Sequence, residues 1–363
     1  MKTIIQVMGM NSTKYGGLER FMLSLVDSCA TINVKFVFVY NSKPESKIYL
    51  EELAKRNIEI IECNCSKLKF IDKINFAKRL LSYKPDIVHF HFYQSKFIFL
   101  IMKMFNRVKL YQTIHSCIQT DFNGRWWFLR KLKHFITWFI YSCLVDQFLG
   151  VSYFVTNQLR FWGIKKVETI YPGVDNYLSE KILIDKGNKK IVTCLGFANP
   201  VKGIDIFIKS LPYIDDSDFE AWIIGLDETV EYTAEMKLLA KQLGVYNRIK
   251  WIGIIDNVGE YFKVSDVFCQ TSRSEALSLA ACEALMYGCP VIGSDVGGLS
   301  EVAQMTFDVG DFKGLGELIN KILLDIEYSE RLKKEAIEKW EDKFKLERGV
   351  NGYKDLYLQD DMN

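Results

Sequence analysis

The sequence predicts an α/β protein made of two doubly wound halves, each a parallel sheet with helices on both faces. Its expected strands are continuously apolar, which is typical of strands buried on both faces. Each expected strand is followed by a segment with helical periodicity, and the same rhythm occurs twice along the chain. The length of 363 residues also fits two domains, at roughly 100–200 residues for each.

The elements of the first half alternate regularly. Amphipathic segments follow the apolar ones, so that each connection passes through a helix. A further apolar run ends at Thr113-Ile114-His115. The remaining strands are expected at 3–8, 35–40, 58–62 and 86–90, and the helices at 18–29, 47–56 and 71–81.

The second half repeats this pattern after a joint near Tyr171–Asp175, where Pro172-Gly173 indicates a turn. The tail from 330 to 358 is expected to form helical segments with charged faces. Strands are expected at 190–195, 220–224, 249–252, 267–270 and 290–293, and helices at 204–211, 233–243, 258–264 and 277–287.

The composition excludes several classes of protein. A net charge of +2, from 47 basic and 45 acidic residues, argues against a whole-chain nucleic-acid binder. The nine cysteines are scattered, and Cys63 and Cys65, the only close pair, lack a second pair that would complete a zinc site. No run approaches the roughly 20 apolar residues that span a bilayer. We therefore expect a reduced, cytoplasmic protein without a bound metal.

The positive charge is concentrated between residues 94 and 166, which hold eleven Lys and Arg against two acidic residues. Aromatic and basic side chains are interleaved there, in Trp126, Trp127, Arg130, Lys131 and Lys133. Such a segment can lie at an anionic membrane surface with its rings at the level of the headgroups. The alternative is a core helix with a solvated basic face.

Two features of the first half stand where ligands bind in open parallel sheets. Gly16 and Gly17 separate the first strand from the first helix, where a close backbone approach and a helix N-terminus favour an anion. A plain turn is the alternative. His89, His91 and His115 follow or end apolar strands, which makes them candidates for a functional cluster or for ordinary buried histidines.

In the second half, Lys202 lies between a strand and a helix, where a compact cation can meet a phosphate. The alternative is an exposed loop lysine. Farther along, Glu275 follows the strand at 267–270 and Glu283 lies on an apolar helix. A carboxylate there needs a partner, and sugar hydroxyls would supply one. The start of that helix offers backbone amides to an anion at Ala276, Leu277 and Ser278.

Taken in order, these motifs resemble those of the retaining GT-B glycosyltransferases of glycosyltransferase family 4. The resemblance covers nearly the whole chain. It rests on Gly16-Gly17 with Glu19, Thr-x-His at His115, Pro-Gly-Val-Asp at 172–175, Lys202-Gly203, Glu275 and Glu283, Gly-x-Pro-Val around Pro290, and Gly297-Gly298 with Glu301.

The resemblance implies a GT-B fold, in which two Rossmann-like domains face a cleft. The acceptor-side domain would span residues 1–173, with a final helix at 344–363 packing back onto it. The nucleotide-sugar domain would span 174–343. The resemblance further implies transfer from a nucleotide-diphosphate sugar, with a UDP-sugar favoured, to a glycan or lipid-linked acceptor in bacterial surface polysaccharide synthesis. Neither a cofactor nor a metal is required, and the enzyme would act at the inner face of the cell membrane.

The resemblance also implies roles for the site residues. Lys202 would bind the diphosphate, Glu275 the hydroxyls of the donor sugar and Glu283 those of the ribose. His115 would lie by the sugar and the reaction centre, so that His115 and Glu275 are the expected catalytic residues. The glycines at 16 and 17, and the amides of 276–278, would also contact the donor.

The sequence departs from the family pattern at two places. Phe197 stands where the family usually carries an arginine that binds the diphosphate together with the lysine at 202. One cation of this pair is therefore missing, unless Arg273 supplies it. The family's Gly-Phe-Gly after Glu275 is Ala-Leu-Ser. These departures support an alternative, in which the chain is a catalytically impaired homologue that stabilises another glycosyltransferase.

Overall fold

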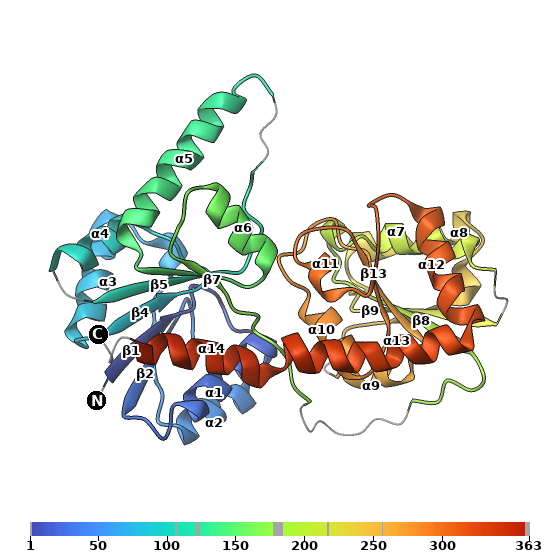
Figure 1. Cartoon of the computed structure of the whole chain (residues 1–363), viewed down its shortest axis with the longest axis horizontal. Coiled ribbons are helices and arrows are strands. Elements are labelled where there is room, and N and C mark those ends of the chain that lie inside the picture. Colours follow the sequence, from blue (N-terminus) through green and yellow to red (C-terminus); the bar gives the residue numbers. More distant parts are fainter. Residues whose placement is uncertain are drawn as a thin grey trace. The chain divides into compact units, whose positions relative to one another are not determined.

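The structure is a computed structural model that describes residues 2–105, 108–120, 124–176, 184–215, 218–255 and 257–359. It divides into two compact units (Figure 1). Unit 1 comprises Met1–Pro172 and Leu346–Asn363, and unit 2 comprises Gly173–Lys345. These divisions lie one or two residues from the boundaries that the sequence suggested.

Unit 1 is built on a seven-stranded parallel sheet in the order β3-β2-β1-β4-β5-β6-β7, so that the chain winds outward in both directions from β1 and β4. The predicted parallel sheet is confirmed. The strands are β1 (Lys2–Val7), β2 (Val34–Tyr40), β3 (Glu59–Glu62), β4 (Ile87–Phe90), β5 (Lys109–Ile114), β6 (Gln147–Gly150) and β7 (Val167–Thr169).

The helices of unit 1 cover this sheet. The sequence pattern did not indicate α4, β6, α6 or β7, and the three residues of β7 are too few to show a period. The helices are α1 (Gly17–Ser28), α2 (Lys47–Lys55), α3 (Phe70–Ser82), α4 (Lys96–Phe105), α5 (Trp127–Leu144), α6 (Tyr153–Phe161) and α14 (Leu346–Leu358).

The C-terminal helix α14 belongs to unit 1, where it packs against α1. Gly349 of α14 allows this helix to lie close to the backbone at Tyr171, since a Cβ on Gly349 would lie 2.3 Å from the Tyr171 carbonyl oxygen. Phe21 of α1 meets Tyr353 of α14 edge to face, with ring centroids 5.0 Å apart. The end of the predicted helix, at 360–363, lies outside the described residues.

Unit 2 repeats the architecture with a six-stranded parallel sheet in the order β10-β9-β8-β11-β12-β13. Its strands are β8 (Lys190–Leu195), β9 (Phe219–Ile224), β10 (Ile249–Ile252), β11 (Val267–Gln270), β12 (Val291–Ser294) and β13 (Met305–Phe307). Its helices are α7 (Ile204–Ser210), α8 (Glu231–Gln242), α9 (Gly259–Val264), α10 (Leu279–Met286), α11 (Leu299–Val302), α12 (Phe312–Leu324) and α13 (Ile326–Lys339).

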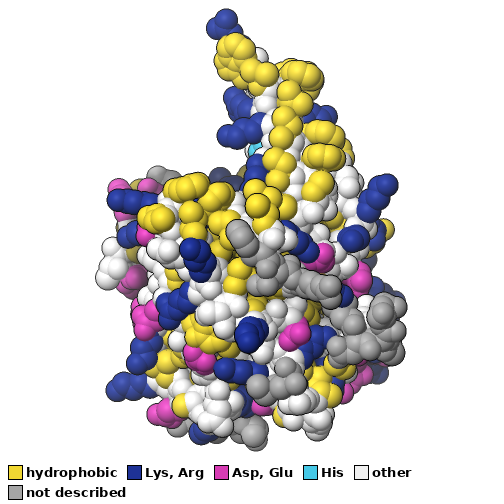
Figure 2. Space-filling view, turned by 90° about the vertical axis from the view of Figure 1, so that its left-hand side faces the viewer, with side chains coloured by type: hydrophobic (Ala, Val, Ile, Leu, Met, Phe, Trp, Pro, Cys, Tyr) yellow, Lys and Arg dark blue, Asp and Glu magenta, His cyan; other side chains and the backbone are white. Residues whose placement is uncertain are grey.

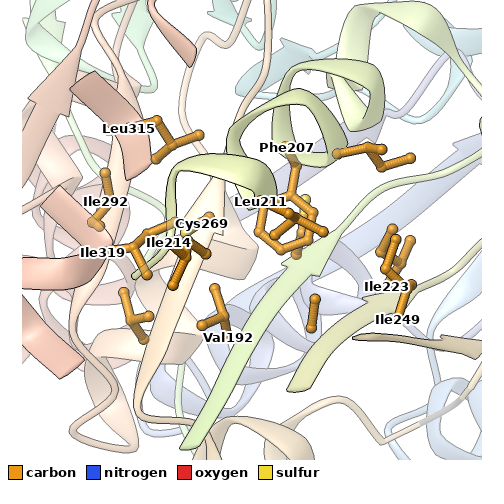
Figure 3. Packing of buried hydrophobic residues seen from close by; sticks show 14 of the residues in the cluster. Val192, Phe207, Leu211, Ile214, Ile223, Ile249, Cys269, Ile292, Leu315 and Ile319 are labelled. Atoms are coloured by element: carbon orange, nitrogen blue, oxygen red, sulfur yellow. The ribbon is translucent and has the colours of Figure 1, made fainter. Parts of the chain in front are cut away.

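One large hydrophobic cluster of unit 2 lies between the sheet and helices that include α7, α8 and α12. Figure 3 shows Val192 and Ile223 from the strands facing Phe207 of α7 and Ile319 of α12. Burial of such side chains stabilises the folded state by about 25 cal/mol per Å² of apolar surface. The packed helices and strands hold the ends of the strands, and so the starts of the loops, in fixed positions. The sheet of unit 2 therefore gives its carboxyl-end loops a rigid base.

Two segments at the border of unit 2 are joined. Val174 pairs with Lys345 in an isolated parallel bridge, in which the Val174 amide donates to the Phe344 carbonyl at 2.8 Å. The indole of Trp340 donates to the Val174 carbonyl at 3.0 Å. The chain thus enters unit 2 and leaves it through two segments that are hydrogen-bonded to each other.

Candidate functional site

Lys202 and Glu275 meet at the carboxyl edge of the unit 2 sheet. Because β8 and β11 are neighbouring parallel strands, the segments that follow them emerge side by side. Lys202 Nζ lies 2.6 Å from Glu275 Oε1, and Ser272 Oγ donates to the same oxygen at 3.2 Å. The Lys202 side chain is 28% exposed and that of Glu275 12%, so the pair remains open to a ligand.

Gly203 allows the Lys202 loop to lie against β11. Its φ of +67° is in the left-handed region, and a Cβ there would be 1.9 Å from the Thr271 carbonyl oxygen. The Thr271 hydroxyl donates to the Gly203 carbonyl at 2.8 Å. Position 203 therefore has no room for any side chain.

Arg273 holds the same loop from the other side. Its guanidinium forms two bonds with the Asp205 carboxylate, of 2.9 and 2.8 Å, and donates to the Pro200 carbonyl at 2.6 Å. Its backbone amide donates to the Val201 carbonyl at 2.7 Å. Although burial alone would raise it, the pKa of Asp205 is lowered by these Arg273 hydrogen bonds and charge.

These contacts show whether Arg273 can replace the arginine that is absent at position 197. Arg273 is engaged in binding the loop, so in this structure it does not stand beside Lys202 as a second free cation. The Phe197 side chain is 49% exposed. In the described part of this loop, Lys202 is thus the cation that the geometry offers to a phosphate.

The segment after Glu275 leads into α10, which begins two residues later than expected, at Leu279. Ser278 is its N-cap, and the Ser278 side chain accepts from the Ala281 amide at 3.2 Å. The serine that replaces a family glycine therefore has a structural role. Glu283 is half-buried on the first turns of this helix.

In unit 1, the predicted anion site at Gly16 and Gly17 is occupied by the chain itself. The carboxylate of Glu19, a buried side chain, accepts from the Gly16 amide at 3.1 Å and from the Ser12 hydroxyl at 2.8 Å. Glu19 thus caps α1 in the manner of half a capping box. A bound phosphate would have to compete with this carboxylate for the Gly16 amide.

The three histidines predicted to lie at strand ends do lie together. His91 Nδ1 is 3.0 Å from His115 Nε2, and the rings of His89 and His91 stack with centroids 4.5 Å apart. His115 is half-buried and stacks on Phe92. Burial lowers the pKa of His89 and of His115 to about 3, and lowers that of His91 well below its usual value. The cluster is neutral near pH 7.

The partners of this cluster were not predicted from the sequence. His91 Nε2 lies 2.9 Å from Gln6 Oε1, and His89 contacts Thr113 and Tyr357. Tyr357 is 268 residues away from His89 along the chain. No local pattern relates the two, since the contact arises only when α14 packs onto unit 1.

The basic aromatic segment forms a surface helix. The first half of α5 extends away from the rest of unit 1 (Figure 1), and apolar and basic side chains are interleaved along it (Figure 2). Trp126, Trp127 and Phe128 are 58%, 48% and 61% exposed. Arg130, Lys131 and Lys133 of this turn are also exposed, whereas Trp138, farther along, is buried. This segment is therefore not the core helix of the alternative interpretation.

Two further observations concern the described part of the chain. None of its helices combines the length and the apolar character needed to cross a bilayer. Within the same residues, no group of three or more His, Cys, Asp or Glu side chains is arranged to hold a metal ion.

Comparison with known proteins gives two family matches that together span most of the chain. Residues 15–176 match "Glycosyltransferase Family 4", and residues 178–339 match "Glycosyl transferases group 1". These matches correspond to the main parts of unit 1 and unit 2.

Relatives and solved structures agree with these matches. N-acetyl-alpha-D-glucosaminyl L-malate synthase of Bacillus anthracis is 25% identical over 77% of this chain and 76% of its own. The O-antigen biosynthesis glycosyltransferase WclY of Escherichia coli is 24% identical over 87% and 90%. The Anabaena protein Alr3699/HepE, solved with UDP and also with UDP-glucose, superposes with a TM-score of 0.79 at 16% identity, covering 99% of this chain and all of that chain. That superposition shows the GT-B fold.

Proposed function

From the premise that the chain belongs to the GT-B glycosyltransferases, with a family 4 domain followed by a group 1 domain, we propose that its donor is a nucleotide-diphosphate sugar, with a UDP-sugar favoured. The observation that carries this proposal is the pairing of Lys202 with Glu275 at the carboxyl edge of the unit 2 sheet. In this proposal the Lys202 ammonium binds the diphosphate and the neighbouring Glu275 carboxylate binds sugar hydroxyls. The complexes of the Anabaena protein with UDP and UDP-glucose support the choice of nucleotide.

The proposed roles follow from the chemistry of each group. Lys202 binds the diphosphate, Glu275 accepts hydrogen bonds from the transferred sugar, and Glu283 accepts them from the ribose. His115 is assigned to the reacting sugar, which a neutral imidazole can meet as an acceptor or as a donor. Residues 276–278 supply backbone amides before the start of α10.

We propose that the transfer retains the anomeric configuration. The bond from C1 of the sugar to the diphosphate oxygen breaks with its electron pair going to the diphosphate, and the acceptor oxygen bonds to C1 from the same face. The acceptor proton passes to the departing phosphate oxygen. Lys202 stabilises the charge that develops on the diphosphate, and no metal is required. The products are the glycosylated acceptor and the nucleoside diphosphate.

The acceptor proposed is a glycan or a lipid-linked glycan of a bacterial surface polysaccharide, as the name of the Escherichia coli relative suggests. The enzyme would then work at the cytoplasmic side of the membrane. The α5 surface supports a peripheral contact with an anionic bilayer, since exposed aromatic rings and cations alternate there.

Calorimetric titration with UDP-, GDP-, ADP- and TDP-sugars tests the donor. Micromolar binding of one nucleotide class is expected, with loss of affinity in Lys202→Ala and Glu283→Ala. Lys237→Ala, which removes a lysine paired with Glu228 on the surface of the same unit, should bind as the wild type does. Absence of binding to every nucleotide would refute the proposal and favour a partner subunit without its own donor.

A transfer rate that is undiminished in EDTA would support metal independence.

Sedimentation with phosphatidylglycerol vesicles tests the membrane contact. Replacing Trp126 and Trp127 by Ser, and Arg130, Lys131 and Lys133 by Gln, should abolish binding, because each basic residue near an anionic leaflet contributes about 1 kcal/mol. The control carries five matched changes on the surface of unit 2. These are Leu324→Ser, Ile326→Ser, Lys313→Gln, Arg331→Gln and Lys334→Gln. Equal binding by both variants would contradict the proposal.

A further inference from the structure

The histidine cluster is part of a continuous chain of hydrogen bonds in unit 1. This hydrogen-bond chain starts at His115, which is half-buried, and ends in the core at Tyr353 of α14. Six bonds connect its seven side chains, and the longest of them is 3.0 Å. In order, the members are His115, His91, Gln6, Tyr357, His89, Thr113 and Tyr353.

Every inner member of this chain uses one donor and one acceptor. A neutral imidazole has one protonated nitrogen and one bare nitrogen, and both ring nitrogens of His89 and of His91 are engaged. The Gln6 side chain accepts through Oε1 from His91 and donates through Nε2 to Tyr357 at 2.8 Å. The direction of one bond therefore sets the direction of the next.

The orientation of Gln6 gives one direction to the whole chain. His91 Nε2 carries the proton that Oε1 of Gln6 accepts, so Nδ1 of His91 is bare and accepts from Nε2 of His115. On the other side, the Tyr357 hydroxyl donates to Nδ1 of His89, and Nε2 of His89 donates to Thr113. All three histidines are then protonated at Nε2.

The direction of the hydrogen bonds determines whether His115 offers a ligand an acceptor or a donor. Its Nδ1 makes no hydrogen bond to the described residues, and His115 as a residue is half-buried. With Nε2 protonated, Nδ1 presents a bare acceptor; with the chain reversed, it presents a donor. The low pKa values of His89 and His115, about 3, keep these rings neutral and their tautomers defined at pH 7.

We propose that His89, His91 and His115 exchange tautomers only together, with a turn of the Gln6 amide, and that this hydrogen-bond chain, which passes through Tyr357 of α14, sets whether His115 meets a sugar hydroxyl as acceptor or as donor. Gln6, His91 and Tyr357 are then positioning residues for His115. The C-terminal helix thereby acts on a residue assigned to the reaction, besides packing on unit 1. The link to sugar binding rests on the proposed function, whereas the coupling of the tautomers does not.

Two-bond ¹H–¹⁵N NMR spectra of the full chain with ¹⁵N-labelled histidine test the coupling, since they separate protonated from bare ring nitrogens. In the wild type, the three histidines should be protonated on the same ring nitrogen, which is Nε2 for the orientation of Gln6 described here. Protonation on different nitrogens in His89 and His115 would overturn the proposal. This measurement uses no donor, so it stands apart from any failure of the proposed function.

Two variants of α14 provide a matched comparison. Tyr357→Phe and Tyr353→Phe each remove one buried hydroxyl, about one helical turn apart. Tyr357→Phe cuts the chain between Gln6 and His89, so the tautomer populations of His89 and His115 should no longer agree. Tyr353→Phe removes only the last member, and the populations should remain equal. Equal separation of the two populations by both variants would overturn the proposal.

A binding measurement connects the coupling to the sugar. Tyr357→Phe should weaken the binding of UDP-glucose about threefold to tenfold while leaving that of UDP unchanged, because UDP lacks the transferred glucose that His115 is proposed to meet. Tyr353→Phe should leave the affinity for both unchanged. Equal loss of affinity for UDP and UDP-glucose in Tyr357→Phe would contradict this role and indicate a general loss of structure.

Discussion

Lys202 Nζ lies 2.6 Å from Glu275 Oε1, so the two groups expected to bind a donor are paired with each other. The side chains come from loops after β8 and β11, 73 residues apart in sequence. The pair keeps both charges in place with little reorganisation when a ligand arrives. A diphosphate bound as proposed would therefore compete with Glu275 for Lys202.

This competition predicts opposite effects of two substitutions on UDP binding. Glu275→Gln removes the competing charge and should tighten the binding of UDP severalfold, up to about tenfold for 1.4 kcal/mol. Lys202→Ala should weaken it. Isothermal titration with UDP measures both, and Glu260→Gln, which alters a surface pair with Lys263, is the control. Weaker UDP binding by Glu275→Gln would contradict the prediction.

Gly203→Ala should destabilise unit 2 strongly. A left-handed conformation costs an L-residue about 1–2 kcal/mol, and here the new Cβ would also lie 1.9 Å from a backbone oxygen. Gly163 has a φ of +85°, and a Cβ added there would have no heavy atom within 4 Å, so Gly163→Ala should lose only the conformational part. Urea unfolding of both variants isolates the steric clash. Equal losses would show that the Gly203 loop relaxes.

Arg273→Ala should lower the free energy of unfolding by about 1–3 kcal/mol, because the half-buried Asp205 carboxylate would keep only its longer contact with Lys209, at 3.4 Å. It should also weaken UDP binding, because the loop that carries Lys202 loses its anchor at Pro200. Arg331→Ala, at an exposed ion pair of α13, should change stability by no more than about 0.5 kcal/mol. Unaltered UDP affinity in Arg273→Ala would show that the loop is held by its other contacts.

The histidine cluster predicts a loss of stability on acidification. Burial lowers the native pKa of His89 to about 3, so below pH 6.5 the unfolded chain binds more protons than the native one. The free energy of unfolding should therefore fall from about pH 6.5 downward, by up to about 1.4 kcal/mol per pH unit for each such histidine. His89→Phe should show a shallower dependence between pH 6.5 and 5 in urea titrations. Parallel curves for the two proteins would exclude His89 as a cause.

Much of the fold could be predicted from the sequence because its signals are local. The strand at 190–195 is apolar throughout and the helix at 204–211 is amphipathic, and parallel strands with crossover helices are the arrangement that buries both. The order of the motifs, from Gly16 to Glu301, then indicated a glycosyltransferase. The three-residue strand Val167–Thr169 was missed because it is too short for a periodic pattern.

The residues with expected chemical roles were chosen by type and by position at the ends of strands. Lys202 and Glu275 are examples, because in a parallel sheet the carboxyl ends of strands lie on one edge whatever the distance along the chain. The sequence could not show that the two side chains pair, or that Arg273 binds Asp205 and is therefore engaged.

The sequence by itself thus determined the class of the fold, the alternation of its elements and the family, because hydrophobic periodicity and motif order are written in neighbouring residues. Only the tertiary structure decided which side chains meet. The contact between His89 and Tyr357, and that between Arg273 and Asp205, join residues far apart in the sequence and depend on how the elements of each unit pack. Packing of that kind is set by shape and volume across the whole unit.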